Sequence, residues 1–321
     1  MKDGRSVLSI QLEDWRRRMT KRVIEISSGP LRISVKHHQL ILTYPDDQQK
    51  QINTEDIGML ILDHPGVTFN VAVVNQLLDC GVSFLICGAG HLPVTWFFPV
   101  ADHALQTERF RIQQGITLPL QKNLWKHIIQ SKIWNQSLCL EACKKSPTDL
   151  RLLRKHVRSG DPSNLEGQAA RIYWKELFGS NFRRDRDGDS PNALLNYGYA
   201  ILRSAIARKI CSAGLHPTFG IHHRNRNNPF VLADDLIEPL RPLVDIVVYN
   251  LWESELDEIN RSSKGKILGL MNQFVWIDEK NQSLQNAIEI YVNSYLESIR
   301  EKKLLLKFPE SLAYEIPESE E

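Results

Sequence analysis

The stretch SPNALLNYGYAILRSAIARKICSAG, Ser190 to Gly214, is the clearest structural signal in the sequence. Serine is favoured as the residue that caps a helix, and proline is favoured at the first helical position. Ser190 and Pro191 supply both at the start of the stretch, and Gly214 stands where glycine commonly follows a helix end. The stretch therefore predicts a long helix, and the sequence on either side indicates the kind of domain that contains it.

From Asp102 onward the hydrophobic period is helical. Helices are predicted over QKNLWKHIIQSKIWNQSLCLEAC, over a basic segment between Pro147 and Gly160, and over DPSNLEGQAARIYWKELFG. Further helices follow, and the last residues form a short acidic run. We therefore expect a helical domain over 101–310 and an acidic tail over 311–321.

The sequence before Asp102 has a different period. RVIEISS, LRISVKHHQLILTY and IGMLILD are rich in β-branched residues that alternate with polar ones, which is typical of strands. GVTFNVAVVNQLLDCG has the pattern of a single helix. Residues 1–18 fit neither domain and are interpreted either as an N-terminal extension or as the product of a start codon assigned too far upstream, before a β-rich domain over 19–100. The predicted fold class is α+β, a small β-rich N-terminal domain followed by a larger all-helical C-terminal domain.

Composition limits the class of protein. The chain has 321 residues, of which 42% are hydrophobic and 24% are charged, as in ordinary globular proteins of one or two domains. No apolar run approaches the roughly 18 residues that cross a bilayer, and the N-terminus lacks the apolar core of a signal peptide. We therefore expect a cytoplasmic protein without a membrane partner. The five cysteines form no CxxC pair and are expected to be buried, reduced thiols.

Several common catalytic motifs are missing from the sequence. It has no GxxxxGK[ST] phosphate loop, no GxGxxG after a strand, no HExxH and no GxSxG. ATP hydrolysis, nicotinamide chemistry and serine hydrolysis are therefore disfavoured.

Two groups of residues can be interpreted either structurally or chemically. Glu166 follows Ser163 by three residues, which satisfies the capping-box pattern, so a helix cap explains this glutamate locally. Asp235 and Glu238 are three residues apart on a predicted helix and face one side of it. That side is either a solvated acidic face or one wall of a site.

The segment GIHHRNRNNPF adds two adjacent histidines. In an extended loop, His222 and His223 point in opposite directions, so at most one of them is expected to bind a given ion. One imidazole with two or three carboxylates suits magnesium or manganese better than zinc. A structural histidine is the alternative.

Arginines gather in two predicted loops. The formal net charge of +2 says little about partners, because nucleic-acid binding depends on where charges cluster. The clustered residues are Arg183, Arg184, Arg186, Arg224 and Arg226. They are either solvated surface charges or contacts to a phosphate backbone.

The order of three long motifs resembles one known family. EGQAARIYW, SPNALLNYGYAILRSAIARKI and GLHPTFGIHHRNRNNPFVLADDLIEPLRP follow a β-rich domain, as in the CRISPR-associated integrases of spacer acquisition, with most similarity to the type II branch. In that family a divalent metal is bound by the glutamate of E-G-x-A-A-R, the histidine closing G-[IF]-x-H and the acid of D-[IL]-x-E-P-x-R-P. The matching positions are Glu166, His223 and Glu238, with Asp235 in a supporting role.

The resemblance implies a specific reaction. The 3′-hydroxyl of a short DNA duplex would attack a phosphodiester in the repeat of a CRISPR array, with Mg²⁺ or Mn²⁺ as cofactor and the five arginines on phosphates. Implied partners are the double-stranded pre-spacer and repeat DNA, a second copy of the chain in a homodimer, a small second adaptation protein and the effector nuclease of a type II system. The alternatives are a metal-dependent DNA endonuclease without integration and a non-catalytic DNA-binding scaffold.

Overall fold

The computed structural model describes residues 21–27, 29–89, 93–97, 104–185 and 188–310. The chain divides into two compact units, Met1–Phe97 and Phe98–Glu321. The predicted extension over 1–18, the acidic tail over 311–321 and the predicted domain boundary at residue 100 lie outside the described residues.

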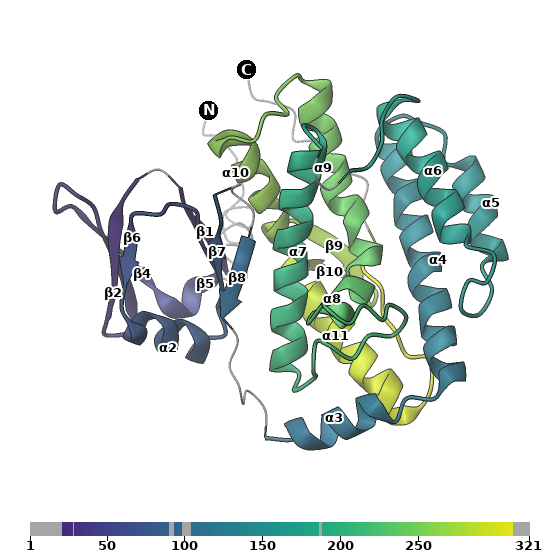
Figure 1. Cartoon of the computed structure of the whole chain (residues 1–321), viewed down its shortest axis with the longest axis horizontal. Helices are drawn as coiled ribbons and strands as arrows, with labels where there is room; N and C mark the ends of the chain where they lie inside the picture. The colour runs from purple at the N-terminus through teal and green to yellow at the C-terminus, as the bar shows by residue number, and fades with distance from the viewer. Residues whose placement is uncertain (1–20, 28, 90–92, 98–103, 186–187, 311–321) are drawn as a thin grey trace, which may run out of the picture. The chain divides into compact units, whose positions relative to one another are not determined.

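The N-terminal unit contains two four-stranded sheets (Figure 1). The first has the order β1-β5-β7-β8, in which β8 alone is antiparallel to its neighbour, and the second has the order β4-β3-β2-β6. The strands of the first sheet are β1 (Arg22–Ile26), β5 (Ile57–Leu62), β7 (Ser83–Cys87) and β8 (Pro93–Phe97). Those of the second are β2 (Leu31–Lys36), β3 (Gln39–Thr43), β4 (Gln49–Asn53) and β6 (Val67–Phe69).

Alternation of apolar residues along these strands creates the core of this unit. Ile33 and Leu40 from the second sheet and Leu60 and Phe84 from the first are at most 1% exposed and belong to one apolar cluster. The 3₁₀ turn η1 (Thr54–Asp56) and the helix α2 (Val71–Asp79) complete the unit. The prediction of a β-rich domain carrying one helix is therefore confirmed.

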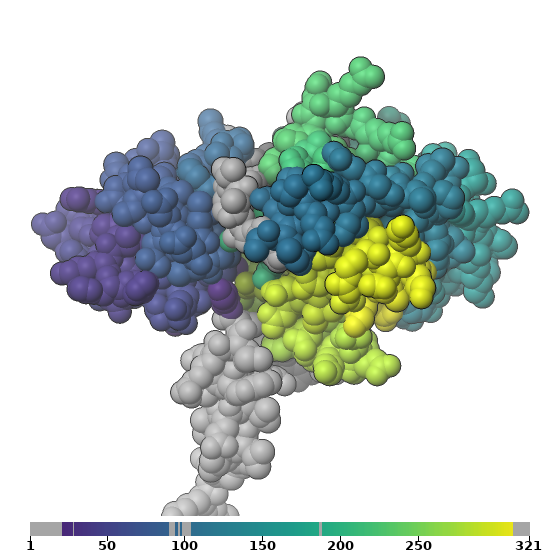
Figure 2. All heavy atoms as spheres, turned by 90° about the horizontal axis from the view of Figure 1, so that it is seen from below, coloured from purple at the N-terminus to yellow at the C-terminus, as the bar shows by residue number. Residues whose placement is uncertain are grey.

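The C-terminal unit is built mainly from helices. They are α3 (Gln106–Gln114), α4 (Leu118–Ala142), α5 (Thr148–His156), α6 (Leu165–Phe178), α7 (Asn192–Ser212), α8 (Val231–Leu236), α9 (Arg241–Glu253), α10 (Arg261–Gly269) and α11 (Leu284–Glu301), with the 3₁₀ turns η2 (Glu238–Leu240) and η3 (Leu270–Asn272). Helix α4 packs against α5, α6, α9 and η2, and α7 packs against α8, α9, α10 and α11. Helices α3 and α11 lie side by side (Figures 1 and 2).

Helix α7 corresponds to the stretch that predicted the helical domain. It ends at Ser212, and Gly214 adopts a φ of 63°, the left-handed conformation expected of glycine after a helix. At its start, Pro191 occupies the cap position and no side chain caps the helix, so the predicted capping role of Ser190 is wrong. None of the helices in the described ranges is long and apolar enough to cross a membrane.

The prediction of an all-helical C-terminal domain is wrong in one element. β9 (Phe274–Ile277) and β10 (Lys280–Ser283) form an antiparallel hairpin. Its two-residue turn, Asp278 and Glu279, has φ values of 51° and 60°, as a primed hairpin turn requires. Four-residue strands joined by an acidic turn give a weak periodic signal, so the sequence pattern did not reveal them.

The five cysteines are free thiols, as predicted. Cys139, Cys143 and Cys211 are buried, as predicted, whereas Cys80 and Cys87 are only partly buried.

Candidate active site

Glu166 lies in the first turn of α6, but it does not cap the helix. The first backbone N–H groups are satisfied by other side chains: Asp161 accepts from Leu165 and Glu166 at 2.9 Å each, and Asn164 accepts from Gly167 at 3.1 Å. The capping-box interpretation with Ser163 as the cap is therefore wrong, since Asn164 is the N-cap residue. The carboxylate of Glu166 is left available for another contact.

Asp235 and Glu238 are buried, so the interpretation of a solvated acidic face is wrong. Asp235 is 0% exposed and Glu238 is 6% exposed. Helix α8 ends at Leu236 and the tighter turn η2 begins at Glu238, so the two carboxylates do not follow one regular helix. Asp235 contacts the preceding loop, whereas Glu238 contacts α4 and α9.

Lys132, from the middle of α4, joins the two predicted metal-binding glutamates. Its Nζ lies 2.6 Å from Oε1 of Glu166 and 2.6 Å from Oε2 of Glu238. The lysine is 9% exposed. Burial alone would lower the pKa of Lys132, but Glu238 and Glu166 outweigh it and raise the pKa above its ordinary value. Two motifs far apart in sequence therefore converge on one buried cation.

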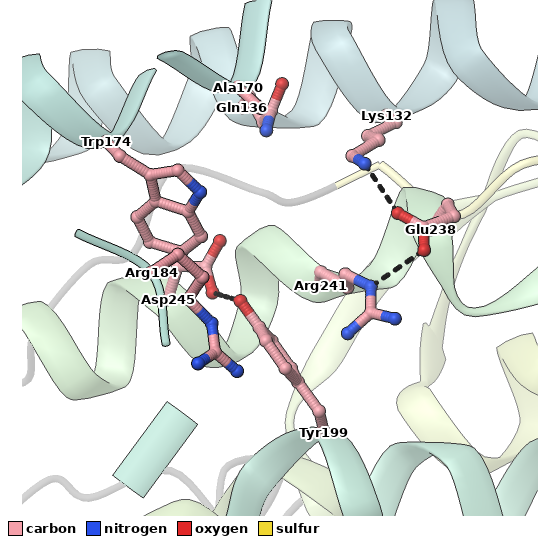
Figure 3. A pocket seen from close by; sticks show the side chains of 9 residues that line it. All are labelled: Lys132, Gln136, Ala170, Trp174, Arg184, Tyr199, Glu238, Arg241 and Asp245. Carbon is pink, nitrogen blue, oxygen red and sulfur yellow. Dashed lines mark hydrogen bonds and ion pairs between the residues drawn. The ribbon is translucent and has the colours of Figure 1, made fainter. Parts of the chain in front are cut away.

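Glu238 is held in its charged form by two cations. Besides Lys132, Arg241 in the first turn of α9 donates from Nε to Oε1 at 3.0 Å (Figure 3). Burial would raise the pKa of Glu238, but Arg241 and Lys132 lower it to about 2. Asn135 of α4 donates to the backbone oxygens of Pro239 at 2.7 Å and Pro309 at 2.9 Å, which ties the turn carrying Glu238 to α4.

Asp235 organises the loop that carries the two histidines. Its Oδ2 accepts from the backbone N–H of Ile221 at 2.6 Å and of His222 at 2.9 Å, and its Oδ1 lies 2.5 Å from Nδ1 of His223. The loop runs so close to the carboxylate that a Cβ at Gly220 would overlap Val231 and lie 3.0 Å from Oδ2 of Asp235. Both oxygens of Asp235 are thus occupied by contacts within the protein, and one of them holds the ring of His223 in position.

His222 and His223 have different surroundings. His222 stacks on Trp125 with ring centroids 4.2 Å apart and an angle of 3° between the rings, and burial lowers its pKa. The hydrogen bond with Asp235 raises the pKa of His223, and the charges of Glu238 and Glu166 raise it further. When Nδ1–H donates to Asp235, the neutral ring of His223 keeps Nε2 for a ligand.

These residues suit a hard divalent cation. In the described part of the chain no three His, Cys, Asp or Glu side chains form a group that could hold a metal ion, and Lys132 lies between the two glutamates. The position between Glu166 and Glu238 nevertheless accepts a cation. Oε2 of Glu238 is buried, and its contact among the described residues is the ion pair with the ammonium of Lys132 at 2.6 Å. Two carboxylates and one imidazole are ligands that Mg²⁺ and Mn²⁺ accept.

A cavity of about 300 Å³ adjoins the Lys132–Glu238 ion pair (Figure 3). Its lining residues are Lys132, Gln136, Ala170, Trp174, Arg184, Tyr199, Glu238, Arg241 and Asp245. Asp245 accepts hydrogen bonds from the hydroxyls of Tyr173, at 2.8 Å, and Tyr199. Burial raises the pKa of Asp245 to about 7, against the lowering effect of these two hydrogen bonds.

Asp245 makes the stability of the protein depend on pH. Between about pH 4 and pH 7 the folded protein holds a proton on Asp245 that the unfolded chain has released. The unfolded state then binds fewer protons, so the free energy of unfolding falls as the pH rises through this window. In the wild type, this fall in the free energy of unfolding should be on the order of a few kcal/mol. Asp245→Asn should abolish it, because asparagine does not titrate. Urea unfolding of both proteins at about pH 4.5 and about pH 7 measures it, and equal pH dependence would contradict the assignment.

The predicted phosphate-binding arginines fall into different environments. Arg183, Arg224 and Arg226 are exposed. Arg184 instead donates to Asn192 at 3.0 Å and to Asn196, and it lines the cavity. Arg186 lies outside the described residues. Contact with DNA stays a prediction for all five.

Sequence reasoning missed Lys132, Asn135 and Arg241. Lys132 and Asn135 are buried polar residues of α4, but α4 carries many other polar residues, so no local sequence pattern singled these two out. Arg241 belongs to the quoted EPLRP motif but received no role.

Sequence comparison finds a matching protein family and a similar curated protein. Residues 25–269 match the model of a family described as CRISPR associated protein Cas1. A curated protein of Neisseria meningitidis serogroup C, named CRISPR-associated endonuclease Cas1, is 34% identical and aligns over 92% of this chain and 97% of its own length.

Solved structures share the fold. A casposase bound to integration product superposes with a TM-score of 0.76 at 22% identity, over 92% of this chain and 96% of the casposase chain. A chain of a Cas6-RT-Cas1–Cas2 complex superposes with a TM-score of 0.70 at 18% identity, over 88% of this chain and 35% of that one.

Proposed function

The chain belongs to the family of CRISPR-associated protein Cas1, and on this basis we propose that it is a metal-dependent DNA integrase of CRISPR adaptation. One observation carries the proposal: Glu166 and Glu238, from separate sequence motifs, approach a common cation at 2.6 Å each. The casposase relative is described as bound to an integration product, which favours strand joining over cutting alone.

The proposed reaction is a transesterification. The 3′-oxygen of an incoming DNA duplex bonds to a phosphorus of the repeat, and the bond from that phosphorus to the 3′-oxygen of the repeat strand breaks. The proton of the attacking hydroxyl ends on the departing oxygen, so neither water nor a protein nucleophile is consumed.

Glu166, Glu238 and Nε2 of His223 would hold Mg²⁺ or Mn²⁺, which when bound supplies a Lewis acid for the charge that develops on the phosphoryl oxygens. Asp235 fixes the orientation of His223 through Nδ1 at 2.5 Å. Arg241 keeps Glu238 ionised and in place.

Joining of both repeat strands needs two such sites at a fixed separation. We therefore propose a homodimer and an assembly with a small second adaptation protein. The name of one similar structure, a Cas6-RT-Cas1–Cas2 complex, supports such an assembly. An effector nuclease of a type II system is a further proposed partner, on the strength of the motif resemblance.

The proposal is tested by incubating the protein with a supercoiled plasmid carrying a repeat and a labelled duplex with 3′-hydroxyl ends. Covalent joining in Mn²⁺ or Mg²⁺, lost with a chelator and with 3′-deoxy ends, is expected. Cleavage without joining would favour the endonuclease alternative, and DNA binding without either product would favour the scaffold.

Arg224 and Arg226 are expected to contact phosphates, since both are exposed next to His223 and neither forms an ion pair with a described residue. The double variant Arg224→Glu, Arg226→Glu should bind DNA more weakly and lower the slope of log affinity against log salt by about 2. Fluorescence anisotropy across a salt series measures both. Arg300→Glu, at an exposed arginine of α11, is the control, and an unchanged slope in the double variant would refute the assignment.

A further inference from the structure

Lys132 occupies the position that the proposed function assigns to a metal ion. Its Nζ lies 2.6 Å from one oxygen of each glutamate, and the side chain is buried. A divalent ion shared by the same two oxygens would lie about 2.0–2.2 Å from each. The ammonium and the ion would therefore compete for nearly the same volume, and their positive charges repel each other.

We propose that Lys132 is a tethered cation that keeps Glu166 and Glu238 together in the metal-free protein and must leave them before a divalent ion binds. The inference rests on the proposed function, because it takes these two glutamates as metal ligands. It assigns to Lys132 two effects of opposite sign: the lysine stabilises the metal-free site and weakens the affinity for metal.

The stabilising effect follows from charge. Without Lys132, the carboxylates of Glu166 and Glu238 would face each other in a partly dehydrated site. Among the described residues, Glu238 alone would then keep a cation, Arg241. Removing one partner of a buried ion pair leaves an uncompensated charge, which strongly destabilises proteins. The lysine thus allows both ligands to be in place before the ion arrives.

The structure also provides room for the displaced ammonium. Lys132 lines the cavity of about 300 Å³, and the lining includes two polar groups that can receive a cation, the carboxyl of Asp245 and the amide of Gln136 (Figure 3). Oε1 of Gln136 is buried without a hydrogen-bond partner among the described residues. Lysine has a flexible four-carbon stem, so its departure needs rotation of the side chain and no rearrangement of α4.

The test is the binding of Mn²⁺ to the full chain, measured by isothermal titration calorimetry, together with thermal unfolding in chelator and in Mn²⁺. Lys132→Met keeps the length of the side chain and removes its charge. We expect its dissociation constant for Mn²⁺ to fall at least about tenfold, because no ion pair has to be broken. Its melting temperature should be lower than that of the wild type in chelator and should rise more in Mn²⁺.

Matched variants separate the causes. Lys122→Met, at an exposed lysine of the same helix, should match the wild type in both measurements. Lys132→Arg retains the charge and should not bind Mn²⁺ more tightly. If Lys132→Met does not fold in chelator, Lys132→Gln takes its place with the same expected outcome.

Unchanged or weaker binding of Mn²⁺ by the neutral variants would overturn the inference. Glu166→Gln distinguishes this result from failure of the proposed function. If wild type and Glu166→Gln bind Mn²⁺ equally, the metal site itself is wrong. If only the wild type binds and Lys132→Met adds nothing, the site stands and the role of Lys132 is wrong.

Discussion

Glu166→Gln is expected to lower the rate of strand joining at least about a thousandfold, roughly 4 kcal/mol in activation free energy, while DNA affinity changes less than about twofold. Glutamine has the same shape as glutamate but lacks the charge that a divalent ion requires. The N-terminus of α6 should stay intact, because Asp161 and Asn164, and not Glu166, accept from its first N–H groups. Lys132 keeps Glu238 as its charged partner, so the buried ammonium is not left unpaired.

Single-turnover joining and fluorescence anisotropy measure the two quantities. Glu176→Gln, at an exposed position of the same helix, is the matched control and should keep full activity. Joining by Glu166→Gln at the wild-type rate would remove Glu166 from the active site. A parallel loss of DNA affinity would instead indicate that the glutamate acts on DNA binding.

Asp235→Ala is expected to destabilise the protein by about 3 kcal/mol or more and to abolish strand joining. The backbone N–H groups of Ile221, His222 and His223 all donate to this buried carboxylate. Alanine leaves these donors without an acceptor and removes the partner of Nδ1 of His223. Loop order and the position of the imidazole are therefore lost together.

Urea unfolding and hydrogen exchange at the amides of 221–223 separate a local from a global effect. Asp79→Ala, at an exposed aspartate, should change the free energy of unfolding by less than about 0.5 kcal/mol. If the three amides exchange no faster in Asp235→Ala than in the wild type, the carboxylate does not organise this loop.

Local signals predicted most of the fold, and they failed where an element is too short to give a periodic pattern. The glycine at 214 and the helical period located α7, and β-branched alternation located the sheets. The hairpin β9–β10 has only four residues in each strand, too few for a periodic pattern.

The site was predictable by motif resemblance and only partly by local physics. The three-residue spacing predicted that Asp235 and Glu238 lie on one side of a regular helix. Because α8 gives way to the turn η2 between them, Asp235 contacts the histidine loop and Glu238 contacts Lys132. The capping-box spacing predicted that Ser163 and Glu166 cap α6 together. Asp161 and Asn164 instead accept from the first N–H groups of the helix. Lys132 is revealed only by long-range packing, because no local pattern states which residues meet across helices.

The two hydrogen bonds donated by the side chain of Asn135 limit where a C-terminal fusion can be attached. Its side chain binds the carbonyls of Pro239 and Pro309, and Glu310 pairs with Trp276 through the backbone in both directions. Pro309 is therefore linked through Asn135 to the turn that carries Glu238, and Glu310 is linked to β9. A purification tag or fluorescent fusion that replaces Pro309 or Glu310 would perturb the site, whereas one attached after Glu310 leaves these bonds intact.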